Sequence, residues 1–217
     1  MADPTALSAS DSSRAIAARE LSCRELMHAT LARIAAVNPT HNAIVSLRDG
    51  DALLREADAR DAELARGESR GWMHGLPQAI KDIALTQGLR TTMGSPLLRD
   101  NVPTHDGLMV QRMKAAGCIV IGKTNTPEFG LGSHTFNEVF GVTRNAFDAS
   151  KSAGGSSGGA AVALATHMLS VADGSDFMGS LRNPAGWNNV FGLRPSQSGT
   201  RHRRADGPHG RRRRAAA

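Results

Sequence analysis

The feature that most constrains the fold is an alternation between amphipathic stretches and short apolar runs along most of the chain. Amphipathic stretches predict helices, and short apolar runs rich in β-branched residues predict buried strands. Helices are expected at about 22–37, 51–66, 106–116 and 160–168, and strands at about 43–47, 76–84, 118–122 and 169–172. Such alternation predicts an α/β fold, with a mixed twisted sheet flanked by helices.

Capping signals place the ends of two of these helices. Ser22 and Glu25 match a capping box, in which the two residues satisfy each other's free backbone amides. The helix that follows is expected to stop at Asn38-Pro39, because proline disfavours helix continuation. Gly67 is the expected C-cap of the next helix.

The formal net charge of +6 resides at one end of the sequence. Residues 198–217 hold seven arginines and one acidic residue, so residues 1–197 carry 19 basic and 19 acidic side chains. The body therefore has no basic bias toward nucleic acid. The stretch 198–217, whose only apolar side chains are alanines, is predicted to be a disordered, non-homologous tail. A frameshift or artificial end after Gln197 accounts for it better than an arginine-rich nucleic-acid-binding arm does.

The remaining composition excludes several classes of protein. Cys23 and Cys118 form neither a disulfide framework nor a metal-ligand spacing, and both are expected to be buried free thiols. The first residues lack the features of a signal peptide, and no apolar run approaches the ~18 residues of a transmembrane helix. We therefore expect a cytoplasmic protein.

Two glycine- and serine-rich segments carry the chemistry, at residues 154–159 and 174–185. The first is GGSSGG directly before a predicted helix, whose free backbone amides would point at a ligand. It lacks the Gly-Lys-Ser/Thr ending of a phosphate-binding loop, and taken alone it would be interpreted as a flexible linker. The second segment argues against a linker, because there Ser180 follows a glycine and precedes Arg-x-Pro.

A serine hydroxyl needs a base before it can act as a nucleophile. None of the histidines stands in a motif that singles it out, so a lysine is the alternative base. The pKa of a lysine must fall from ~10.4 to roughly 7–8 for this work, and burial can lower it that far. Lys81 lies among apolar neighbours in Gln78-Ala79-Ile80-Lys81-Asp82-Ile83, where such burial is expected.

Four motifs together resemble the amidase signature family. They are GLPQAIKD, GKTNTPEFG, AGGSSGGAAVA and GSDFMGSLRNPA, in the order and spacing of that family. Lys81 and Ser156 are 75 positions apart, and Ser156 and Ser180 are 24 apart, as in the Lys–Ser–Ser triad of the family. The resemblance covers about residues 5–197, the N-terminal portion of the family's fold.

The resemblance implies a role for each motif residue. Ser180 would attack an amide carbonyl, Ser156 would relay the proton after a cis peptide bond, and neutral Lys81 would act as base. The oxyanion would be held by the backbone amides of Phe177, Met178, Gly179 and Ser180. Supporting roles fall to Gly155, Ser157, Asp176 and Arg182. Lys123 in GKTN is expected to be structural. No cofactor and no metal are implied.

Two departures from the family pattern guide the choice of activity. Met178 stands where many members have glycine, and its side chain is expected to affect substrate choice. The A subunit of the tRNA-dependent amidotransferase typically has Asn-Met-Asp-Glu-Phe and Gly-Gly-Ser-Ile-Arg, where this chain has NTPEF and MGSLR. Both differences favour a general amidase, and the alternative is the A subunit.

The resemblance also bears on partners and on the isolated chain. A small-molecule amide is the expected substrate, without membrane or nucleic-acid partners, and a homodimer stays open. Family members are considerably longer than this chain. We therefore expect it to be poorly soluble or inactive, because a sheet cut short exposes strand edges and apolar faces.

Overall fold

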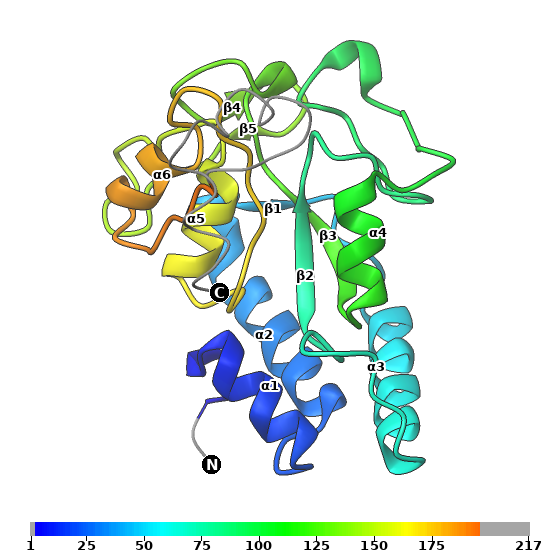
Figure 1. Ribbon diagram of the computed structural model, residues 1–217. Helices are drawn as coiled ribbons and strands as arrows, with labels where there is room; N and C mark the ends of the chain where they lie inside the picture. Colours follow the sequence, from blue (N-terminus) through cyan, green and yellow to red (C-terminus); the bar gives the residue numbers. More distant parts are fainter. Residues whose placement is uncertain (1–2, 196–217) are drawn as a thin grey trace, which may run out of the picture.

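A computed structural model describes residues 3–195 (Figure 1). The predicted tail, residues 198–217, lies outside the described residues. The chain folds into helices packed around a small mixed sheet, which confirms the predicted α/β class. No helix within residues 3–195 is both long and apolar enough to span a bilayer.

The central sheet has three strands in the order β1-β3-β2. β2 (Pro77–Lys81) runs parallel to β3 (Ile119–Thr124), and β1 (Ile44–Val45) pairs antiparallel with the other edge of β3. Every residue of β2 and β3 is buried. Burial on both faces is typical of parallel strands covered by helices, and it explains why these segments are apolar runs rather than alternating ones.

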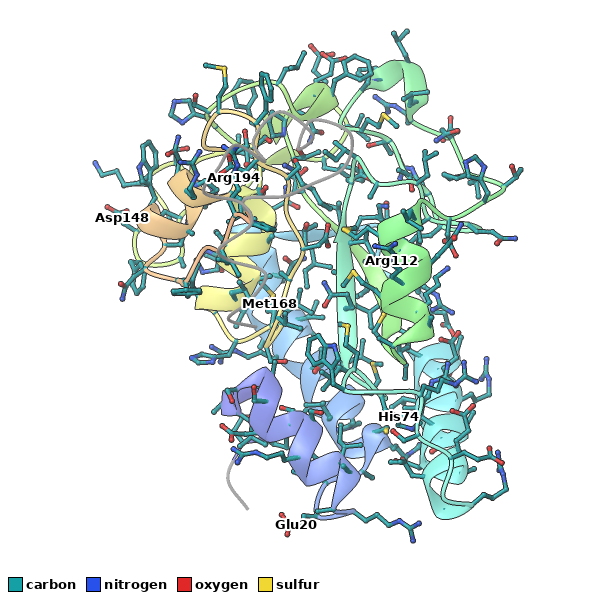
Figure 2. The ribbon with its side chains drawn as sticks, viewed as in Figure 1. Glu20, His74, Arg112, Asp148, Met168 and Arg194 are labelled. Atoms are coloured by element: carbon teal, nitrogen blue, oxygen red, sulfur yellow. The ribbon has the colours of Figure 1, made fainter. Side chains whose placement is uncertain are left out.

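Helices cover both faces of this sheet. α3 (Gly50–Ala65) and α4 (Leu108–Ala115) lie on one side of β2 and β3, and α5 (Gly158–Ala165) and α6 (Arg182–Trp187) lie on the other (Figure 1). α2 (Cys23–His41) packs against α3 and β2 below, next to α1 (Ala9–Ala17). His74 lies near the lower end of β2, beside α3 (Figure 2), and its Nε2 is 3.0 Å from the Arg60 carbonyl of that helix.

The remaining elements are short. A hairpin joins β4 (Phe136–Asn137) to β5 (Gly141–Val142). Single 3-10 turns occur at Pro4–Ala6, Pro96–Leu98 and Glu128–Gly130. The hairpin, α1, α6 and these turns are too short or too weakly periodic to stand out in the sequence.

The capping box is confirmed at the start of α2, but its predicted end is wrong. The Ser22 hydroxyl accepts the Glu25 amide at 3.0 Å, and the Glu25 carboxylate accepts the Ser22 amide at 2.9 Å. The helix continues through Pro39 to His41. It ends at Asn42, which adopts a left-handed conformation with φ 52°. Proline in the last turn lacks one helical N–H, and this loss does not stop the helix.

The predicted strand at 169–172 is absent. No strand within the described chain pairs with this segment, and without a ladder partner an extended run is not a strand. Instead, the Asp173 side chain contacts the edge of β2 that faces away from β3, where its carboxylate oxygens accept the Lys81 backbone amide.

The core lies between the sheet and the helices. Its buried side chains include Met27, Leu53, Leu76, Ile80, Val110, Ile121 and Met168. Cys23 and Cys118 are buried free thiols, as expected, and burial is the main cause that raises the pKa of the Cys118 thiol to about 11. This core fixes the end of β2, where the candidate site begins.

Candidate active site

Lys81 is the last residue of β2, and its side chain is only 1% exposed. Its Nζ lies 2.8 Å from each of three serine hydroxyls, those of Ser156, Ser157 and Ser175. The first two come from the glycine-rich loop before α5, and the third comes from the loop after it. The structure therefore brings Lys81 and Ser156 together across 75 positions of sequence.

Burial lowers the pKa of Lys81 to about 7, because the ammonium loses water that the hydroxyls only partly replace. The carboxylates of Asp173 and Asp176 oppose this shift. A lysine with such a pKa is substantially neutral near pH 7, and a neutral amine can accept a proton.

The loop that carries Ser156 is held tightly. The Gly155–Ser156 peptide bond is cis, as the resemblance implied. Thr126 Oγ1 donates to the Ser156 carbonyl at 3.1 Å, and Thr135 Oγ1 donates to the Gly154 carbonyl at 2.8 Å. A Cβ at Gly155 would lie 2.8 Å from the His134 backbone nitrogen, so the loop admits only glycine there.

A second loop carries Ser180 and is organised by Asp176. The Asp176 carboxylate accepts the backbone amides of Gly179, Leu181 and Arg182 at 2.8, 3.3 and 3.2 Å. It also pairs with the Arg182 guanidinium at 2.9 and 3.0 Å. These bonds, with the Arg182 side chain first, hold the pKa of Asp176 well below its usual range.

Arg194 was not predicted from the sequence. It reaches Asp176 at 3.5 Å from the segment after α6, above α5 in Figure 2.

The Ser180 loop lies next to the Ser156 loop. The Ser157 amide donates to the Ser180 carbonyl at 2.9 Å. Within residues 3–195 the Ser180 hydroxyl makes no hydrogen bond, so the described structure links Lys81 to Ser156 but not Ser156 to Ser180.

The four expected oxyanion donors differ in their present partners. The Gly179 amide donates to Asp176, whereas the Met178 and Ser180 amides have no partner within the described chain. The Phe177 and Met178 side chains are largely exposed beside this loop, Met178 to 83%. Backbone N–H groups without a protein acceptor are the kind of donors that bind a developing oxyanion.

Lys123 lies on the other face of the sheet. In the parallel register Lys123 is opposite Ile80, whereas Lys81 is opposite Thr124, so the two lysines point to opposite sides. Lys123 Nζ donates to the Ala84 carbonyl at 2.7 Å and to Thr86 Oγ1 at 2.9 Å. It contacts none of the site serines, which agrees with a structural role.

Two residues near Lys81 escaped the sequence interpretation. Ser175 lies in the motif GSDFMGSLRNPA but was assigned no role, although its hydroxyl contacts Lys81 Nζ. Asp173 accepts the Lys81 backbone amide with both carboxylate oxygens, at 3.1 and 3.2 Å. Their only signal was their position shortly before Ser180, Ser175 inside the second segment and Asp173 directly before it. Within residues 3–195 no cluster of three or more His, Cys, Asp or Glu side chains could hold a metal ion.

Comparison with known proteins identifies the family. The family model described as "Amidase" matches residues 25–204. The chain belongs to the amidase signature family. Members of this family act on amide bonds.

Curated relatives of this amidase-family chain include the A subunit of the glutamyl-tRNA(Gln) amidotransferase of Acidothermus cellulolyticus. The two are 45% identical over 184 residues, which cover 85% of this chain and 36% of the relative. The corresponding protein of Streptomyces coelicolor is 39% identical over 199 residues, covering 92% of this chain and 40% of the relative. The chain thus spans less than half the length of these relatives.

Solved structures of the family share the fold. A bacterial aryl acylamidase superimposes with a TM-score of 0.82 at 33% identity, over 87% of this chain and 39% of its own. A peptide amidase bound to chymostatin gives 0.81 at 36% identity, over 88% and 40%. A fatty acid amide hydrolase gives 0.81 at 28% identity, over 87% and 34%.

Proposed function

We propose that this chain carries the centre of an amidase that hydrolyses carboxylic amides through an acyl-enzyme, with Ser180 as nucleophile, Ser156 as relay and Lys81 as base. The observation that carries the proposal is the 2.8 Å hydrogen bond between Lys81 Nζ and Ser156 Oγ at a buried position. A surface lysine beside a serine would stay charged and could not act as base. Burial removes that objection here.

The proposed reaction begins with two coupled proton transfers. Neutral Lys81 takes the Ser156 hydroxyl proton, and Ser156 takes the proton of Ser180 as Ser180 Oγ attacks the amide carbon. The C=O electron pair moves to oxygen and forms a tetrahedral oxyanion. This step requires Ser180 Oγ to come within hydrogen-bonding distance of Ser156 Oγ. We propose that substrate binding brings the two hydroxyls together.

The oxyanion then collapses. Its electron pair re-forms the carbonyl, the C–N bond breaks, and the leaving nitrogen takes the proton held on the relay. Water adds to the resulting Ser180 ester through the same relay and releases the carboxylic acid. The Met178 and Ser180 amides are the donors best placed to hold the oxyanion, and Phe177 completes the set. Gly179 joins it only by leaving Asp176.

A serine-directed fluorophosphonate tests the nucleophile, together with hydrolysis of a panel of primary amides and anilides. We expect the probe to label Ser180, and Ser180→Ala to lower labelling and hydrolysis to background, a loss of several orders of magnitude. Ser150→Ala, which alters an exposed serine, is the matched control and should behave as wild type. Equal labelling of Ser180→Ala and wild type would contradict the assignment.

The A subunit of a glutamyl-tRNA(Gln) amidotransferase is the second candidate, and the curated relatives favour it. The residues of this chain at NTPEF and MGSLR favour the general amidase instead. An assay of amide-nitrogen transfer to glutamyl-tRNA(Gln), beside simple amide hydrolysis, separates the two. Hydrolysis without transfer supports the amidase, and transfer in the presence of partner subunits supports the alternative.

An inactive chain is the third candidate, since the chain spans less than half the length of the curated relatives that it matches. Folded protein that neither reacts with the fluorophosphonate nor hydrolyses any amide of the panel would support it. Hydrolysis of an amide of the panel that is lost in Ser180→Ala would exclude it, whereas labelling alone would show only an activated serine in an open site.

A further inference from the structure

The open edge of β2 is the feature that carries a further inference. β2 lies at the edge of the three-stranded sheet, and Asp82, the next residue, donates its amide to the Thr124 carbonyl of β3. Successive amides of a strand point to opposite sides. The Lys81 amide therefore points away from β3, toward the edge where no strand within residues 3–195 pairs.

A carboxylate fills this place. Both oxygens of Asp173 accept the Lys81 amide, at 3.1 and 3.2 Å. Two residues later, the Ser175 hydroxyl accepts a hydrogen bond from Lys81 Nζ at 2.8 Å. The segment leading to Ser180 thus holds Lys81 at its backbone and at its amine.

We propose that Asp173 is a positioning residue for Lys81: its carboxylate closes the open edge of β2 at the Lys81 backbone amide and thereby fixes the strand end that carries the buried amine. The effect of Asp173 on catalysis rests on the proposed function. Its effect on the position of Lys81 can be measured without an activity assay. An unpaired amide at this buried edge would leave the end of β2 free to shift, and the amine would shift with it.

The charged groups that act on Asp173 come from β2 and β3. Lys81 faces it from β2 and Lys123 acts on it from β3, whereas Asp176 acts on Lys81 from the same loop. Asp173 in turn helps to raise the pKa of the Cys118 thiol, just before β3, for which burial is the larger cause. Desolvation raises the pKa of Asp173, and the two lysines partly offset that shift. The carboxylate in turn favours the charged form of Lys81, so it opposes the burial that makes the amine neutral.

Two substitutions separate the geometric effect from the charge. Asp173→Asn keeps an oxygen that can accept the Lys81 amide and removes the charge, whereas Asp173→Ala removes both. Asp100→Asn removes an exposed carboxylate elsewhere and serves as the control for net charge.

The measurements are amide hydrogen exchange at Lys81 and an NMR titration of the Lys81 side chain, assigned with Lys81→Arg. We expect exchange at Lys81 to be about tenfold faster in Asp173→Ala and nearly unchanged in Asp173→Asn. We expect the titration midpoint of Lys81 to fall in Asp173→Asn and to stay in place in Asp100→Asn.

Equal Lys81 exchange in Asp173→Ala and wild type would overturn the proposal, as would an unmoved midpoint in Asp173→Asn. If Asp173→Ala does not fold, Asp173→Ser, which also lacks the charge but offers a shorter acceptor, takes its place in the exchange measurement. Failure of the proposed function looks different. In that case Ser180 would not react with the fluorophosphonate, although Lys81 responds to Asp173 as described.

Discussion

At the scale of single residues, the chemistry depends on one amine that burial makes partly neutral. Lys81 has three hydroxyl neighbours and no carboxylate within salt-bridge distance among the described residues, so its charge is poorly compensated. Hydroxyls donate to a neutral amine as readily as they accept from an ammonium. The same contacts therefore hold the amine in both protonation states, as a proton relay requires.

We expect the rate of Ser180 labelling by the fluorophosphonate to rise with pH through about 7 and to level off above about 8, because only neutral Lys81 accepts the relay proton. Pseudo-first-order rates between pH 5.5 and 9 measure the inflection. Lys81→Arg is the control, since a guanidinium stays charged, and its rate should be low across this range. A rate that does not change with pH would exclude Lys81 as the base.

The sequence is informative about some of these residues and silent about others. Lys81 could be selected because it stands in an apolar strand, and Ser156 because it lies in the glycine-rich segment 154–159. Ser180 could be selected because it follows a glycine and precedes Arg-x-Pro in a family motif. Asp173 could not, because it acts on a backbone amide, and the direction of that amide depends on which edge of β2 is open. Ser175 reaches Lys81 only because the loop turns back over the strand end.

At the scale of elements, the loop before α5 is fixed by close backbone packing. A Cβ at Gly155 would lie within 3.0 Å of three backbone atoms of Ser133 and His134. Backbone atoms cannot move aside to accommodate it as the end of a flexible side chain could. A Cβ at Gly186 in α6 would have nothing within 4 Å, so the same substitution meets open space there.

Gly155→Ala should therefore destabilise the fold by about 1–3 kcal/mol and displace the Ser156 hydroxyl. Gly186→Ala should be neutral or stabilise by up to about 1 kcal/mol, since alanine favours helix over glycine. Chemical denaturation of both variants measures the difference. Equal stability of the two variants would show that the loop relaxes at little cost.

Element boundaries show where sequence patterns stop being informative. The apolar runs placed β2 and β3 correctly because both faces of these strands are buried. The run at 169–172 has a similar composition, yet strand formation also needs a neighbouring backbone, which local sequence does not reveal. Likewise Pro39 stands in a last turn, where a missing amide matters little.

At the scale of the whole molecule, two buried lysines on opposite faces of one sheet link folding to pH. Burial lowers the pKa of Lys81 to about 7 and that of Lys123 to about 8. In the unfolded chain both return to about 10.4. Between these values the unfolded chain binds more protons than the folded chain, so stability must rise with pH.

Below about pH 7 both lysines are charged in both states, and the penalty of burying them is fully present. As pH rises through the folded pKa values the amines become neutral and the penalty is relieved, by up to about 1.4 kcal/mol per pH unit for each lysine. We expect the unfolding free energy of wild type, relative to a Lys81→Met/Lys123→Met variant, to increase from pH 6.5 to 9. Urea unfolding at fixed pH steps measures it.

Taking the difference between the two proteins removes the opposing contribution of the cysteines. Burial raises the pKa of the Cys118 thiol to about 11, so above about pH 8.5 the unfolded chain loses thiol protons and stability falls in both proteins alike. Each single variant, Lys81→Met or Lys123→Met, should remove part of the rise of unfolding free energy with pH. The part that depends on Lys81 should appear at lower pH, because its pKa is the lower of the two. If the difference in unfolding free energy between wild type and the double variant stays constant from pH 6.5 to 9, folding does not lower the pKa of either lysine. That result would contradict the assignment of Lys81 as the base.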